Sequence, residues 1–76
     1  MSFQAYLTNI EAKTGKSPAD FRAYAAEKGW LAGEALNADV KVGTIVADLK
    51  AEFALGHGHA MAIVALLKGK KNEGDA

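Results

Sequence analysis

The fold is decided by residues 42–67, which read VGTIVADLKAEFALGHGHAMAIVALL. The first half of this stretch repeats its bulky apolar residues with a helical period, which predicts a helix with one buried face. The residues on that face are Val42, Ile45, Val46, Leu49 and Phe53. The second half predicts a helix from Ala60 to Lys68 that is apolar on every side and belongs at the centre of a bundle or in an interface. Its bulky residues are Met61, Ile63, Val64, Leu66 and Leu67.

The first predicted helix lies near the start of the sequence. Ser2 is a residue type that caps helices, and Phe3, Leu7 and Ile10 follow it at helical spacing. Gly15 is expected to end this helix, because glycine readily adopts the left-handed conformation that follows a last helical turn.

The second predicted helix has the clearest start signal in the chain. Ser17 is the cap and Pro18 fits the first helical position, while Asp20 is placed to bond back to the cap amide. The buried stripe of this helix comprises Phe21, Tyr24 and Ala25. Gly29 is expected to end it.

The segment after the second helix carries the weakest signals. The Trp30–Leu31 pair is expected to fold back on the last helical turn, as the apolar contact that accompanies a glycine stop. Residues 32–39 predict a loop or a short irregular turn. Asn37 or Asp39 is expected to cap the next helix. A strand over Val40–Val42 is rejected because the sequence offers it no partner strand.

The composition sets the size and class of the protein. The 76 residues, of mass 8.0 kDa, make one small domain, assigned to residues 1–68 with a polar tail at 69–76. Apolar residues are 50% of the chain, so a folded core is expected. The lack of cysteine excludes disulfide scaffolds, thiol catalysis and cysteine zinc sites. The sequence therefore predicts an all-α fold, a compact bundle of about four short helices.

The sequence also suggests where the protein is found. Residues 1–6 lack the basic and apolar regions of a secretory signal. The longest apolar run, Ala60–Leu67, is eight residues long, whereas about 18 are needed to cross a bilayer. We expect a soluble cytoplasmic protein that makes no contact with a membrane.

Two segments of the chain resemble a known family. They are residues 2–18, SFQAYLTNIEAKTGKSP, and residues 41–62, KVGTIVADLKAEFALGHGHAMA. Both are similar to a family of short bacterial proteins, domain of unknown function 4287 (DUF4287), and the string GHGHAMA at 56–62 is a fairly specific part of the match. The resemblance implies a soluble, bacterial, helical protein and implies no catalytic activity.

The candidate functional residues are Gly56, His57, Gly58 and His59, which interrupt the apolar pattern between the last two helices. In one interpretation these residues only connect the last two helices, because Gly56 ends the third helix and Gly58 permits a tight reversal of the chain into the fourth. In the other, free amides at the start of the fourth helix bind a phosphate or carboxylate, and the two histidines add donors. Both interpretations stay open on the sequence alone.

The same turn resembles a helix-hairpin-helix, a motif that grips a nucleic-acid backbone through the amides of its turn. The surrounding charge does not favour this function, because Glu52 lies close before the turn and only Lys50 assists. Nine basic residues balance nine acidic ones, whereas DNA binding needs several groups that neutralise phosphates. Nucleic-acid binding is therefore the alternative and not the favoured function.

Metal binding and catalysis are weaker candidates. An extended His57-Gly-His59 segment can place two imidazoles on one ion, but zinc needs three or four ligands, and nothing requires Glu52 or Glu34 to serve. Asp48 and Glu52 are expected on one exposed helical face, and the serines are better explained as helix caps. The sequence predicts no enzyme, no metal and no cofactor.

The favoured function is a non-catalytic binding or protein-interaction module that self-associates as a homodimer. The reason is the helix at 60–68, whose apolar surface is hard to cover with three short, alanine-rich neighbours. Tyr6, Tyr24 and Trp30 are expected in the core rather than in a pocket, because aromatic residues at helical spacing are core residues by default.

Overall fold

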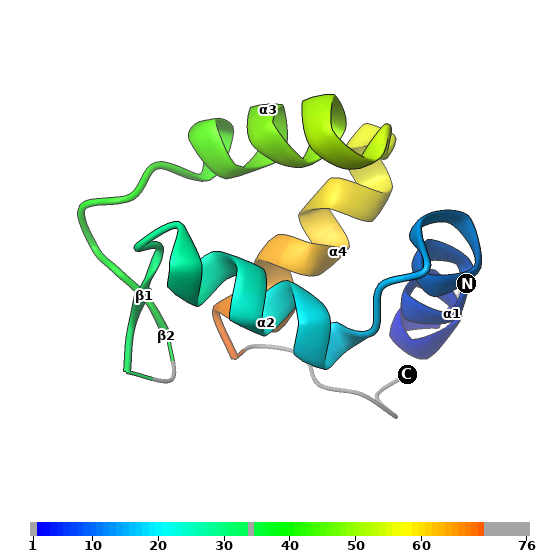
Figure 1. Cartoon of the computed structure of the whole chain (residues 1–76), viewed down its shortest axis with the longest axis horizontal. Coiled ribbons are helices and arrows are strands. Elements are labelled where there is room, and N and C mark those ends of the chain that lie inside the picture. Colours follow the sequence, from blue (N-terminus) through cyan, green and yellow to red (C-terminus); the bar gives the residue numbers. More distant parts are fainter. Residues whose placement is uncertain (1, 34, 70–76) are drawn as a thin grey trace.

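The computed structural model describes residues 2–33 and 35–69, and four helices account for most of them (Figure 1). The elements are α1 (Phe3–Thr14), α2 (Pro18–Glu27), β1 (Leu31–Ala32), β2 (Ala35–Leu36), α3 (Val42–Phe53) and α4 (His57–Leu67). The predicted all-α bundle is confirmed. Most of the polar tail assigned to 69–76 lies outside the described residues.

The predicted boundaries of α1 are confirmed. The Ser2 hydroxyl accepts a hydrogen bond from the Ala5 amide at 3.2 Å, so it caps the helix. Gly15 ends the helix in the left-handed conformation, at φ 74°. The stripe of Phe3, Leu7 and Ile10 is buried, as its spacing predicts.

The predicted boundaries of α2 are confirmed as well. The Ser17 hydroxyl accepts from the Asp20 amide at 3.2 Å, and an Asp20 carboxylate oxygen accepts from the Ser17 amide at 2.9 Å. Gly29 follows the helix at φ 78°. The Trp30 amide then donates to the Ala25 carbonyl at 2.9 Å, which folds the buried Trp30 ring back onto the last turn.

The predicted loop after α2 contains a minimal antiparallel hairpin. Leu31 pairs with Leu36 and Ala32 with Ala35. Gly33 lies in the turn at φ 71°, a backbone conformation that favours glycine. Strands of two residues leave almost no periodic pattern in a sequence, which is why the prediction gave only an irregular turn.

The predicted cap of α3 is wrong. Lys41 is the N-cap and makes no capping hydrogen bond through its side chain. Asn37 lies too early, and its side-chain oxygen instead accepts from the Asp39 amide at 3.0 Å, forming a local turn. The rejection of a strand at 40–42 is confirmed, because α3 begins at Val42. The face predicted for α3 points into the core, with Ile45, Val46 and Leu49 buried and the two end residues half-buried.

Helix α4 is the centre of the bundle. Each of α1, α2 and α3 packs against α4, and the backbones of these three helices come close to α4 more often than to one another. In Figure 1, α4 runs diagonally from the end of α3 toward α2, with α1 on its other side. Its buried residues are Ala60, Ala62, Ile63, Val64, Leu66 and Leu67. The sequence predicted this helix either at the centre of a bundle or in an interface, and the structure shows it at the centre.

Met61 is the exception on α4. Its side chain is 37% exposed, and it is the exposed large apolar residue of the part of the chain that the structure describes. Three neighbouring helices cover the rest of α4, so its apolar surface does not by itself require a second subunit. Across residues 2–33 and 35–69, no helix combines the length and the apolar character that a membrane crossing requires.

Candidate functional site

The connection between α3 and α4 differs from the prediction. Ala54, rather than a glycine, follows α3 in the left-handed conformation, at φ 55°. Leu55 comes next and is buried, with 3% of its surface exposed. Gly56 has an extended backbone, φ −72° and ψ 168°, and is the N-cap of α4. Gly56 therefore begins α4 instead of ending α3, and Gly58 lies inside the first turn of α4, which starts at His57.

The first turn of α4 brings all four predicted site residues together. The first hydrogen bond of the helix joins the Ala60 amide to the Gly56 carbonyl at 2.9 Å, so the amides of residues 57–59 have no acceptor within the helix. No side chain caps them. Gly56 and Gly58 are exposed, and open space surrounds the position of a Cβ at each. This turn presents uncovered amides and a partial positive charge, an arrangement that suits an anion.

The two histidines of this turn lie in different surroundings. His57 is exposed. His59 is half-buried and packs edge-on against Tyr6 of α1, with ring centroids 5.5 Å apart. Its Nε2 atom is buried and has no hydrogen-bond partner. His59 thus belongs mainly to the contact between α1 and α4.

The helical conformation of this turn removes the geometric basis of the metal site. The metal interpretation needs an extended backbone, whereas His57 and His59 are helical, and residues two apart on a helix do not share a face. Among the residues that the structure describes, no three His, Cys, Asp or Glu side chains are grouped so that they could hold an ion. Glu34, one of the two candidate third ligands, lies outside the described residues.

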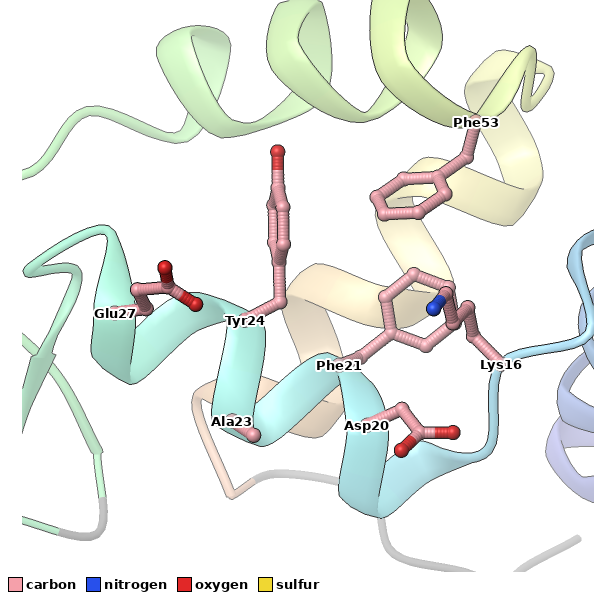
Figure 2. Close-up of a pocket in the computed structure, with 7 residues that line it drawn as sticks. All are labelled: Lys16, Asp20, Phe21, Ala23, Tyr24, Glu27 and Phe53. Carbon is pink, nitrogen blue, oxygen red and sulfur yellow. The ribbon is translucent and has the colours of Figure 1, made fainter.

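A second site lies between α2 and α3. Phe21 and Tyr24 extend from α2, and Phe53 extends from α3 to meet them (Figure 2). The Phe53 ring packs edge-on against both, with centroids 5.2 Å from Phe21 and 5.1 Å from Tyr24. Beside these rings is an open cavity of about 200 Å³, here called the aromatic groove. Its lining residues are Lys16, Asp20, Phe21, Ala23, Tyr24, Glu27 and Phe53.

One side of the aromatic groove is a continuous stripe of α2. Asp20 lies three residues before Ala23 and four before Tyr24, and Glu27 lies four and three residues after them, the intervals that share a helix face. Ala23 is exposed and contributes only a methyl group to the lining. The carboxylates of Asp20 and Glu27 stand at opposite ends, about 10 Å apart along the helix axis. The groove therefore combines an aromatic wall with an acidic group at each end of the stripe.

Tyr24 also connects α2 to α3 by a hydrogen bond. Its hydroxyl donates to one carboxylate oxygen of Asp48 at 2.6 Å, and the Lys28 ammonium lies 3.5 Å from the other. Burial, this hydrogen bond and the charges of Asp48, Glu52 and Glu27 raise the pKa of the Tyr24 hydroxyl, which therefore remains a donor at neutral pH. Asp48, predicted on an exposed face, is half-buried because it accepts this bond.

The aromatic groove was not predicted from the sequence. Of the three aromatic residues expected in the core, Trp30 is buried, whereas Tyr6 and Tyr24 are half-buried, and Tyr24 lines the groove. The available signal was that Tyr24 and Phe53 lie at the margins of their helical stripes. Spacing within one helix cannot show whether such marginal residues from two different helices meet.

Comparisons with known proteins agree with the resemblance seen in the sequence. Residues 2–69 match the model of a protein family described as a domain of unknown function, DUF4287. No curated protein and no solved structure matches the chain. The match confirms the resemblance at 2–18 and 41–62 and extends it through the hairpin segment between them.

Proposed function

We propose that this chain, which belongs to the DUF4287 family of domains of unknown function, is a non-catalytic binding module that engages a partner protein through its aromatic groove. The observation that carries the proposal is that Tyr24 and Phe53 are only half-buried and line an open groove between α2 and α3. Aromatic residues in a concave surface are frequent anchors for partner proteins, because they offer a large apolar area at a low cost in side-chain entropy.

A peptide library displayed on phage, selected against the purified domain, tests this proposal. Peptides that engage the groove are expected to shift the amide NMR signals of Ala23 and Tyr24 and the ring signals of Phe53. Phe53→Leu keeps apolar bulk but removes the ring, and we expect it to weaken binding about tenfold. Met61→Leu makes a comparable apolar change outside the groove and is expected to leave binding unchanged. Selected peptides that map to another surface would contradict the proposal.

Self-association is the other form that this proposal can take, with a second copy of the chain as the partner. The apolar surface of α4 does not support self-association, because α1, α2 and α3 cover α4 within one chain. What supports it now is only the half-buried aromatic surface at Tyr24 and Phe53. A homodimer predicts a doubled mass in light scattering and concentration-dependent shifts at these two residues. A monomer at high micromolar concentration would rule this form out.

Binding of phosphate or a nucleic-acid backbone at the start of α4 is the second candidate function. It is supported by the uncapped amides of residues 57–59 and by the exposed Gly56 and Gly58 beside them. Gly56→Asp would place a carboxylate at the N-cap. There it would accept hydrogen bonds from the free amides and repel an anion. Phosphate or an oligonucleotide should therefore shift these amides in the natural chain and not in the variant. An absence of shifts at low salt would remove this candidate.

A cytoplasmic location is part of the proposal, and it rests on the sequence alone. Fluorescence microscopy of the tagged chain tests it, and an envelope-associated signal would contradict it.

A further inference from the structure

The charge around the aromatic groove is predominantly acidic. Asp20 and Glu27 line it, and Asp48 and Glu52 lie near enough to the Tyr24 hydroxyl to affect its ionisation. Lys16 also lines the groove, and Lys28 pairs with Asp48. Within the lining itself, the carboxylates of Asp20 and Glu27 stand against the single ammonium group of Lys16.

The protein already places one cation on this aromatic cluster. The Lys28 ammonium lies over the Tyr24 ring, 5.3 Å from its centroid. A cation in this position is attracted by the negative face of the ring, and the attraction adds to that of nearby carboxylates. Phe53 offers a second ring to the groove.

On the basis of the proposed function, we infer that the partner presents an arginine side chain, which binds in the aromatic groove with its guanidinium against the aromatic rings and paired with a carboxylate of the lining, Glu27. A guanidinium suits this site because it stacks on an aromatic ring and pairs with a carboxylate at the same time. The open cavity of about 200 Å³ gives room for the alkyl stem of the arginine. Asp20 contributes charge from the other end, although one of its oxygens is already occupied by the Ser17 amide.

The test titrates the full-length domain with a short capped peptide that contains arginine between glycines, and with the same peptide containing citrulline. Citrulline has nearly the shape of arginine but no charge. The arginine peptide is expected to shift the signals of Ala23, Tyr24 and Phe53, and the citrulline peptide is not. Added salt should weaken the arginine complex, because exposed charges are screened.

Three variants separate the contributions of the ring and of the charge. Phe53→Leu is expected to weaken binding of the arginine peptide about five- to tenfold, through loss of the cation–π contact. Glu27→Gln should weaken it about two- to fivefold. Glu11→Gln makes the same change of charge on the exposed surface of α1, away from the groove, and should leave the affinity unchanged. Asp20→Asn is a poor probe, because it also breaks the cap of α2.

The possible outcomes separate this inference from the proposed function. Equal binding of the two peptides, or equal loss of affinity in Glu27→Gln and Glu11→Gln, would overturn the inference. Library peptides that occupy the groove without a basic residue, and that bind independently of salt, would also overturn it, but they would uphold the interaction module. If neither the arginine peptide nor the library perturbs the groove, both proposals fail.

Discussion

The two connections between consecutive helices, α1 to α2 and α3 to α4, are stabilised by different kinds of interaction. Between α1 and α2, Gly15 provides the left-handed turn and the Ser17–Asp20 capping box satisfies two amides. Between α3 and α4, an alanine provides the left-handed turn, and no side chain caps the next helix. The buried Leu55 lies between those two positions.

This difference shows that local hydrogen bonds and tertiary packing are interchangeable means of reversing a chain. The left-handed conformation costs Ala54 free energy that a glycine would not lose. Burial of the Leu55 side chain against the core contributes about 1.5–3 kcal/mol, enough to offset that cost. The uncapped amides of α4 are then left for solvent or for a ligand.

The largest expected effect comes from removing the packing that holds the α3–α4 connection. Leu55→Ala should lower the free energy of unfolding by about 2–4 kcal/mol, because it leaves a cavity beneath the turn. Leu31→Ala, at a half-buried position in β1, is the matched control and should cost less. Urea denaturation followed by circular dichroism measures both. Equal losses in the two variants would show that Leu55 has no special role in the connection.

Removing the local hydrogen bond at the other connection should have a smaller effect. Ser17→Ala deletes the hydroxyl that caps α2, and we expect a loss of about 1 kcal/mol in the same denaturation experiment. Ser17→Thr keeps a hydroxyl and should recover most of the stability. If the threonine variant is as unstable as the alanine variant, the capping bond is not the cause.

Giving the α3–α4 connection a glycine should stabilise the protein. Ala54→Gly relieves the left-handed strain, and we expect a gain of about 0.5–1 kcal/mol in the free energy of unfolding. The same change at Ala51, an exposed position inside α3, is the control and should destabilise, since glycine is unfavourable within a helix. A loss of stability at both positions would show that Ala54 is not strained.

The smallest effect is a pH dependence of stability at the α1–α2 connection. Hydrogen bonds from the Ser17 amide and hydroxyl lower the pKa of Asp20 below its ordinary value of 3.8. Since the unfolded chain binds this proton more readily, the contribution of Asp20 to stability is complete above pH 3.8 and is lost as the pH falls through the lower folded pKa. Asp20→Asn should reduce the acid dependence of stability, and an unchanged dependence would contradict this.

The sequence-based predictions were correct where the interactions join residues close together in the chain, and they failed where the interactions join separate helices. The caps at Ser2 and Ser17 and the stops at Gly15 and Gly29 were predicted correctly, because each depends on groups within five residues. The α3–α4 connection was misassigned, since Gly56 and Gly58 gave the expected turn signal while the reversal occurred at Ala54. The four candidate residues lie together at the start of α4, and the aromatic groove was not foreseen.

The sequence by itself determined the four helices, their apolar faces and the family of the chain. These follow from side-chain periodicity and from capping groups close together along the chain. Only the tertiary structure decided that three helices cover α4, that burial of Leu55 permits a left-handed alanine, and that Tyr24 meets Phe53 and Asp48 across two helices. Such contacts depend on how separate helices pack against one another, a free-energy balance that no local pattern records.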